Sequence, residues 1–178
     1  MAAAADNRRR PLRHHEARLI LGIGLVGMLL TGSGAFIALM PDPVAPELTV
    51  YTLDGRSIPL ASLRGKPVLV TFWATTCPAC VQEIPHLAAL YREWQPAGLE
   101  IIGIAMAYDP PHYVLQMIEH RRIPYPIALD PLGEAAQAFG NVRLTPTSFL
   151  ISPQGRIAEQ RVGAWNPSAL RASIQAMF

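Results

Sequence analysis

The chain contains two cysteines, Cys77 and Cys80, and only Pro78 and Ala79 separate them. A disulfide between residues this near to each other closes a very short loop and would restrict the unfolded chain little. A structural zinc ion is usually held by four ligands, of which two thiolates would supply half. We therefore predict that the pair is redox-active and alternates between two thiols and a Cys77–Cys80 disulfide.

The elements around the cysteines would make Cys77 the more reactive of the two. Residues 68–74 form a continuous apolar run, which is typical of a strand buried on both faces. Residues 78–94 then show the periodicity of an amphipathic helix, with Cys80 on its inner face. Cys77 would cap that helix, where unpaired N–H groups and the helix dipole stabilise a thiolate. Cysteines in such positions have pKa values of about 3.5–7.5. We expect Cys77 to be the exposed nucleophile and Cys80 the resolving thiol, while Pro78 in the first turn costs no helical hydrogen bond.

An apolar segment near the amino terminus predicts attachment to a membrane. Residues 19–40 carry no charge, and as a helix they would be about 33 Å long, enough to cross a bilayer. Several arginines lie within residues 1–18, so these residues are expected to form a basic cytoplasmic tail, with the rest of the chain exported. A cleaved signal peptide is the alternative, because residues 33–35 are small. The formal net charge of +2 is too small to indicate a nucleic-acid partner.

The remaining chain predicts one α/β domain. Residues 41–47 are proline-rich and are expected to form an extended linker that lifts the domain, residues 48–178, off the membrane. From the amino end we expect a hairpin over 48–60, a strand over 99–106, a helix from Asp109 as its cap to about 122, a strand over 125–129, a helix over 132–139, a hairpin over 148–162 and a helix over 166–177. This order predicts a mixed sheet that is covered by helices on both faces.

Several motifs together resemble those of the TlpA/ResA-like family of membrane-anchored disulfide reductases. These motifs are FWATTCPAC (72–80), Glu-Ile-Pro (83–85), LTPTSFLISPQGRI (144–157) and a helix-and-strand insert near 108–129. The resemblance covers about residues 45–178. It implies a thioredoxin fold with an N-terminal hairpin, and a thiol-disulfide oxidoreductase that needs no cofactor beyond its own disulfide.

The family also implies a location and partners. The protein would be a single-pass protein of the bacterial inner membrane, with its C-terminal domain in the periplasm. Its partners would be thiol-containing client proteins, such as apocytochrome c or copper-site assembly proteins, and a membrane electron donor of the thiol-disulfide type. The function implied is disulfide reduction during cytochrome c or cytochrome oxidase assembly.

The resemblance assigns roles to residues outside the cysteine pair. Thr145-Pro146 matches the family's cis-proline loop, which would hold the Thr145 backbone beside the sulfurs to pair with a substrate strand. Glu83 lies three residues after Cys80, so the two would be neighbours on the helix surface. In similar proteins an acid here handles the active-site proton; the alternative is an acid that only complements the helix dipole. Trp73 is expected to pack beside the site and shield the thiols.

The site departs from the family pattern at two points. Thr76 stands where most relatives have tryptophan, and the dipeptide between the cysteines is Pro78-Ala79, whereas many relatives have proline directly before the second cysteine. The enclosed dipeptide helps to set the thiol pKa and the reduction potential. A dithiol oxidant therefore remains an alternative to a reductant. Thioredoxins proper have a buried acid where this chain has Thr71, which favours Glu83 as the local acid.

The cysteine pair is also compatible with two other classes of function, copper binding and peroxidase activity. An exported thioredoxin fold can bind copper through two cysteines and a histidine, but His86, His112 and His120 are not where that family places its ligand. We therefore expect no metal site, with a copper-binding metallochaperone as the alternative. A peroxidase would place threonine three residues before the reactive cysteine, and that position is Ala74.

Overall fold

The computed structural model describes residues 42–178. The predicted cytoplasmic tail and the predicted membrane anchor at 19–40 lie outside these residues. Among residues 42–178, no helix is both long and apolar enough to cross a membrane.

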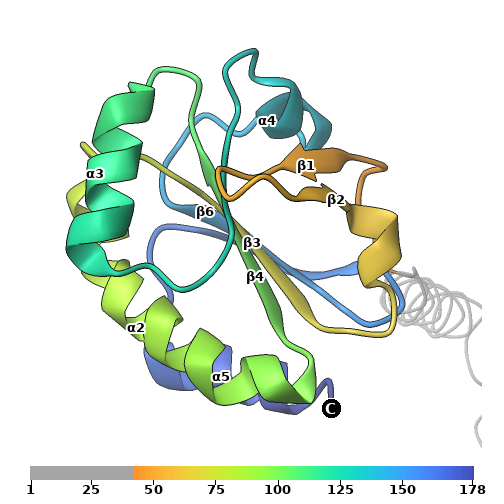
Figure 1. Cartoon of the computed structure of the whole chain (residues 1–178). Coiled ribbons are helices and arrows are strands. Elements are labelled where there is room, and N and C mark those ends of the chain that lie inside the picture. Colours follow the sequence, from red (N-terminus) through yellow and green to blue (C-terminus); the bar gives the residue numbers. More distant parts are fainter. Residues whose placement is uncertain (1–41) are drawn as a thin grey trace, which may run out of the picture. The chain divides into compact units, whose positions relative to one another are not determined.

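A five-stranded mixed sheet forms the centre of the domain (Figure 1). Its strands are β3 (Val68–Trp73), β4 (Glu100–Ala105), β5 (Ile127–Leu129), β6 (Thr147–Ile151) and β7 (Ile157–Val162), in the spatial order β5-β4-β3-β6-β7. Strands β3, β4 and β5 are parallel, whereas β6 is antiparallel to β3, and β7 to β6. The predicted mixed sheet is therefore confirmed. The predicted N-terminal hairpin is also present, with β1 (Thr49–Tyr51) paired to β2 (Ser57–Pro59).

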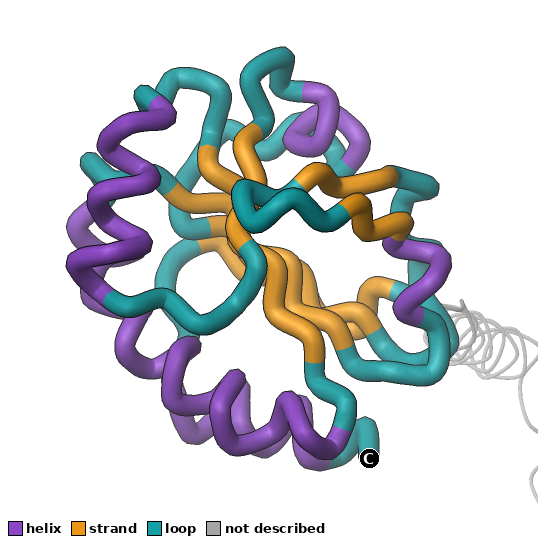
Figure 2. The backbone as a smooth tube through the Cα atoms, in the orientation of Figure 1, coloured by secondary structure: helices purple, strands orange, loops and turns teal. Residues whose placement is uncertain are grey.

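Helices cover the sheet on both faces (Figures 1 and 2). They are the α-helices α2 (Pro78–Trp94), α3 (Pro111–Arg121), α4 (Glu134–Ala138) and α5 (Pro167–Gln175), with two short 3-10 helices, η1 (Leu60–Leu63) and η2 (Gln95–Ala97). One apolar cluster joins α2, α3 and α5 to one face of the sheet, and a second joins the hairpin, η1 and α4 to the other face. Every residue of β3 is buried because side chains from both of its faces enter these clusters.

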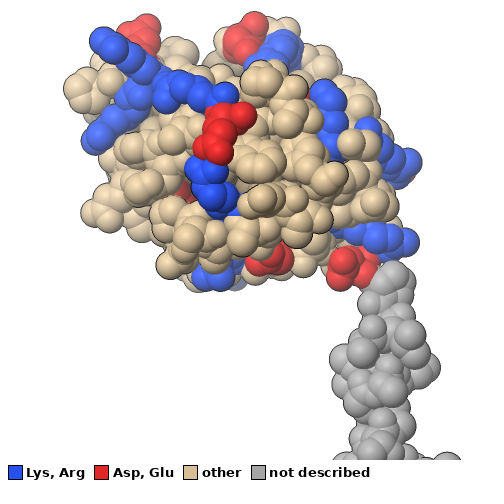
Figure 3. All heavy atoms as spheres, turned by 90° about the horizontal axis from the view of Figure 1, so that it is seen from below, with Lys and Arg blue, Asp and Glu red and all other residues tan. Residues whose placement is uncertain are grey.

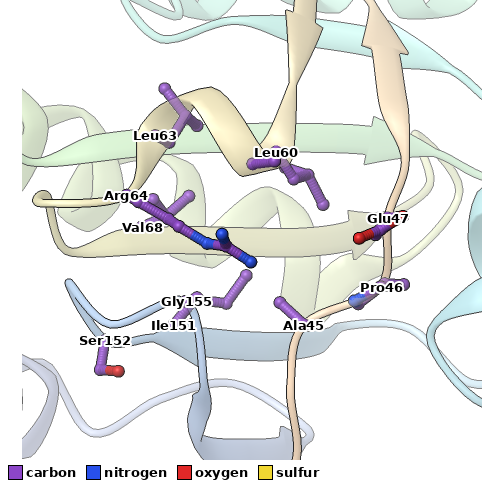
Figure 4. Close-up of a pocket in the computed structure, with 11 residues that line it drawn as sticks. Ala45, Pro46, Glu47, Leu60, Leu63, Arg64, Val68, Ile151, Ser152 and Gly155 are labelled. Atoms are coloured by element: carbon purple, nitrogen blue, oxygen red, sulfur yellow. The ribbon is translucent and has the colours of Figure 1, made fainter.

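The segment expected to be a linker is bonded to the domain. The Ala45 N–H donates to Gly155 O at 2.9 Å, and the Ile157 N–H donates to Pro43 O at 2.7 Å. Side chains from this segment, η1, β3 and β6 surround a small pocket, across which Arg64 extends (Figure 4). Residues 43–45 therefore pack against the β6–β7 turn, which is not the behaviour of a spacer that lifts the domain off a surface.

The start of α3 differs from the prediction. Asp109 was expected to cap this helix, but the N-cap residue is Pro110, and no side chain caps the helix. The predicted insert is otherwise present, because α3 follows β4 and leads to β5, which extends the sheet at its edge. By contrast, a side chain does cap α5, since Asn166 accepts from Ser168 N and Ala169 N.

The side chains of Ile127 and Trp73 lie so close to Gly103 in β4 that this position has no room for a larger residue. A Cβ atom at Gly103 would lie 2.5 Å from Ile127 Cδ1 and 3.2 Å from Trp73 Nε1. Gly103 thus leaves the space over the sheet that the side chains of Ile127 and Trp73 occupy.

We expect Gly103→Ala to lower the free energy of unfolding by about 1–3 kcal/mol, because it overpacks the core. Urea denaturation measures the change. Adding Ile127→Val removes the Cδ1 atom, so the double variant should lose less than the sum of the two single variants. If the losses of unfolding free energy in the two single variants simply add in the double variant, the contact with Ile127 Cδ1 is not what excludes a larger residue at position 103.

Candidate active site

The two cysteines lie at the junction between the end of β3 and the start of α2. Cys77 is the N-cap residue of α2, and the two sulfurs are joined in a disulfide with the Cα atoms 5.3 Å apart. The Cys80 N–H donates to Cys77 Sγ at 3.2 Å. The same N–H would face a thiolate on Cys77 after reduction, and charge-assisted bonds of this kind favour the anion. The predicted position of Cys77 at the cap is confirmed.

The two sulfurs differ in how far they reach solvent. Cys77 is half-buried, whereas Cys80 is 3% exposed and packs in the apolar cluster under α2. Of the two residues between them, Pro78 is exposed and Ala79 half-buried. This asymmetry favours Cys77 as the sulfur that meets a client and Cys80 as the one that later displaces it. Which sulfur attacks remains a prediction.

The proline loop reaches the same edge of the sheet as the cysteines. The Thr145–Pro146 peptide bond is cis, as the resemblance implies. Strand β6 starts at Thr147, which lies opposite Phe72 near the end of β3, so the loop before β6 is next to the loop that carries Cys77. Within residues 42–178, no hydrogen bond engages the backbone N–H or C=O of Thr145. Both groups are therefore free to pair with an extended client segment.

Glu83 is buried, contrary to the expectation that it lies on the helix surface. It is 5% exposed, and its Oε1 accepts a hydrogen bond from the Trp165 N–H at 2.8 Å. Burial raises the pKa of Glu83, while the Trp165 N–H and the positive charges of His86 and Arg161 oppose that rise. A carboxyl group that gains its proton more readily than usual can exchange one with a neighbouring thiol.

Glu83 also lines a cavity of about 300 Å³ between α2 and the amino end of α5. His86, Trp165 and Arg171 form part of its wall, and His86 is exposed on the surface of α2. The guanidinium carbon of Arg161 lies 4.8 Å from the centre of the Trp165 ring. The residue whose backbone fixes Glu83 is therefore itself held by packing and by a cation–π contact.

Two polar contacts near the site were not predicted from the sequence. The Asp109 carboxyl accepts from Thr75 N and Thr75 Oγ1, both at 2.6 Å. Ser148 Oγ donates to Thr71 Oγ1 at 2.9 Å between two neighbouring strands. Thr71 therefore occupies the position of the buried acid in thioredoxins as a neutral, hydrogen-bonded side chain.

Trp73 packs in the core beside the site, as expected. It is 4% exposed and belongs to the same apolar cluster as Cys80. The three histidines considered as copper ligands lie on two helices, with His86 on α2 and His112 and His120 on α3. In the part of the chain that the structure describes, no three His, Cys, Asp or Glu side chains gather in a way that could hold a metal ion.

Comparisons with known proteins agree with this geometry. The AhpC/TSA family model matches residues 41–160. Thiol-disulfide oxidoreductase ResA of Halalkalibacterium halodurans is 37% identical over 119 residues, which cover 67% of this chain and 66% of that protein. ResA of Bacillus anthracis is 34% identical over 131 residues, which cover 74% of this chain and 75% of that one.

Solved structures give the same result. A thiol:disulfide interchange protein of the thioredoxin family from Chlorobium tepidum superposes with a TM-score of 0.71 at 29% identity, covering 78% of this chain and 97% of that one. The thioredoxin domain of a thiol-disulfide oxidoreductase from Bacteroides vulgatus gives a TM-score of 0.66 at 25% identity, covering 78% of this chain and 97% of that one. The predicted thioredoxin fold is thus confirmed.

We expect Glu83→Gln to change how stability depends on pH. The raised pKa of Glu83 means that the native state holds this proton more tightly than the unfolded state does. The resulting stabilisation is complete below the ordinary Glu value of 4.5 and is lost as pH rises through the raised pKa. The free energy of unfolding of the variant, relative to wild type, should therefore increase from pH 4.5 upward by about 1.4 kcal/mol for each unit that the pKa is raised.

Urea denaturation of the oxidised protein between pH 4 and pH 8 measures this difference. Glu93→Gln on the same helix is the matched control, because the Arg171 side chain lowers the pKa of exposed Glu93 below 4.5, so this substitution should give no rise with pH above 4.5. A pH-independent difference between wild type and Glu83→Gln would contradict the raised pKa.

Proposed function

Because this chain belongs to the ResA-like thiol-disulfide oxidoreductases of the AhpC/TSA family, we propose that it is a membrane-anchored reductant of disulfides in exported client proteins. The observation that carries the proposal is the unequal dithiol at the amino end of α2, with a half-buried Cys77 and a buried Cys80. The unpaired Thr145 backbone next to it supports a polypeptide substrate, because an extended chain can pair there.

The reaction begins with reduced protein. The Cys77 thiolate attacks one sulfur of the client disulfide, the client S–S bond breaks, and the other client sulfur leaves as a thiolate that takes up a proton. Cys80 then loses its proton and attacks Cys77 Sγ. This step forms the Cys77–Cys80 disulfide and releases the second client thiol. The client gains two electrons, and a dithiol donor must return two electrons to this protein.

Glu83 is the candidate acid and base in this cycle. It lies one helical turn beyond Cys80, and its pKa is raised by burial. In its carboxylate form it can accept the Cys80 proton, and in its protonated form it can donate to a leaving thiolate. Its bond with the Trp165 N–H leaves the second carboxyl oxygen for this exchange, since that oxygen takes part in no hydrogen bond within residues 42–178.

We infer the location and the clients from the family resemblance and from the amino-terminal sequence. The uncharged segment 19–40 and the arginines before it support an anchor in the bacterial inner membrane, with the domain in the periplasm. We propose clients whose cysteines must be reduced before a haem or copper group is attached, such as apocytochrome c or copper-site assembly proteins. Lysine, arginine and acidic side chains are interspersed on the face shown in Figure 3, which suits protein partners better than nucleic acid.

Cys80→Ser should trap clients as mixed disulfides, because the first attack still occurs and the resolving thiol is missing. Non-reducing electrophoresis of the full chain, followed by sequencing of the captured peptides, identifies them. Cys77→Ser is the control and should capture at most a small fraction of that amount, since its remaining thiol is buried. Equal capture by both variants would reverse the roles of the two cysteines.

The direction of electron flow is tested by the reduction potential. A glutathione titration of the full chain should give a value nearer to the about −270 mV of thioredoxin than to the about −120 mV of a strong periplasmic oxidant. A value near the oxidant would make this protein a donor of disulfides and would overturn the proposed direction.

A further inference from the structure

Asp109 forms a buried connection between the insert and the loop that carries Cys77. It is 5% exposed, and both of its carboxyl oxygens are bonded to Thr75: Oδ2 accepts from the backbone N–H and Oδ1 from the hydroxyl, each at 2.6 Å. Thr75 is two residues before Cys77, whereas Asp109 is 34 residues further along the chain than Thr75. This is therefore a tertiary contact between the insert and the loop that carries Cys77.

The sheet brings these two residues together. Strands β3 and β4 are parallel neighbours that end at the same edge, with Trp73 opposite Ala105. The Met106 N–H continues this pairing by donating to Trp73 O at 3.0 Å, and a turn closed by Asp109 N and Met106 O follows. The loop after β3 and the loop after β4 therefore leave the sheet side by side.

The prolines after Asp109 leave its carboxyl group available for this contact. Pro110 and Pro111 have no N–H, and the side chain of Asp109 does not cap α3. A carboxyl group in the loop after β4 is free to reach across to the neighbouring loop. There it meets the backbone N–H of Thr75, a group that would be costly to leave without a partner in a part-buried position.

The loop held in this way sets the direction of the Cys77 sulfur. The Cys77 N–H donates to Ala74 O at 3.1 Å, so residues 74–77 form a tight turn with Thr75 inside it. The turn places Cys77 at the N-cap position of α2, where the Cys80 N–H donates to Cys77 Sγ. We propose that Asp109 is a positioning residue that holds this turn and thereby keeps the Cys77 thiolate aligned with the amino end of α2, which makes the insert a working part of the redox site.

Two effects of Asp109 on Cys77 have opposite signs and can be separated. If Asp109 positions the turn, its loss weakens the alignment of the thiolate with the helix N–H groups and raises the Cys77 pKa. If Asp109 acts mainly as a nearby negative charge, its loss removes a repulsion and lowers the Cys77 pKa. Positioning should prevail because the carboxyl is bonded to two donors of Thr75 and not to the sulfur.

Three variants of the full chain test the proposal. Asp109→Ala removes both the bonds and the charge. Asp109→Asn removes the charge, but its amide can still accept from Thr75 N and donate to Thr75 Oγ1. Asp130→Ala is the matched control, because Asp130 is also 5% exposed and accepts two backbone N–H bonds, from Ala135 and Ala136, in a loop that carries no cysteine.

The measurement is the rate at which a small alkylating reagent modifies reduced Cys77 as a function of pH, together with the rate of attack on a small aromatic disulfide. For Asp109→Ala we expect the Cys77 pKa to rise by about one unit, which leaves about tenfold less thiolate at pH 5. Because each thiolate of higher pKa is also more nucleophilic, attack should slow by about threefold. Asp109→Asn should stay near wild type, and Asp130→Ala should lose stability without changing either rate.

Each other outcome overturns the proposal. An unchanged Cys77 pKa in Asp109→Ala would show that the Asp109–Thr75 contact has only a structural role. An equal fall of the Cys77 pKa in Asp109→Ala and Asp109→Asn would show that the charge of Asp109 has the larger effect. Should Asp109→Ala fail to fold, Thr75→Val removes only the hydroxyl bond and must raise the Cys77 pKa, while Thr75→Ser must restore it. The inference rests on the thiol chemistry of the site and on no particular client, so failed client capture would leave these measurements unaffected.

Discussion

The bond from the Cys80 N–H to Cys77 Sγ is the interaction on which the site depends. It exists because the chain turns from β3 into α2 at Cys77, so that the first unpaired N–H groups of the helix meet a sulfur. A thiolate at this position would be stabilised by this N–H and by the helix dipole. The same bond makes the thiol a better leaving group and a more available nucleophile, which are the two properties that disulfide exchange needs.

The rest of the domain keeps this turn in place against the sheet. Strands β3, β4 and β6 contribute the loops at one edge, and the buried face of α2 packs in one cluster with Trp73, α3 and α5. The insert contributes Asp109 to the turn, and the chain just before α5 contributes the Trp165 N–H to Glu83. Segments far apart in the sequence thus add hydrogen bonds to the site, whereas the sulfurs come from a single stretch.

This division explains what the sequence could predict. The cap at Cys77, the strand before it and the helix after it are local patterns, so periodicity and capping rules predicted them. The cis bond at Thr145-Pro146 followed from the family resemblance. The burial of Glu83 did not, because its partner Trp165 is supplied by a loop far along the chain, and a helix with a proline inside gives no local sign of it. Asp109 was misassigned for a related reason: an Asp before two prolines has the local pattern of a helix cap, and only the parallel pairing of β3 with β4 shows that it reaches Thr75 instead.

The stabilised thiolate also limits how reducing this protein can be. Any contact that favours the reduced, anionic form of Cys77 makes the disulfide a stronger oxidant, because stabilising the reduced form raises the reduction potential of the disulfide. A reductant at this site therefore needs an opposing contribution, and the buried carboxyl group of Glu83 on α2 can supply one. Glu83 in its ionised form would repel a negative charge on the sulfurs, and His86 and Arg161 favour that ionised form because they oppose the rise of the Glu83 pKa. Asp109 acts in the other direction, because its two bonds to Thr75 hold the turn that aligns the Cys77 thiolate with the amino end of α2. We expect the balance between the helix terminus and the charge of Glu83 to contribute, together with the Pro78-Ala79 dipeptide, to the direction in which electrons move.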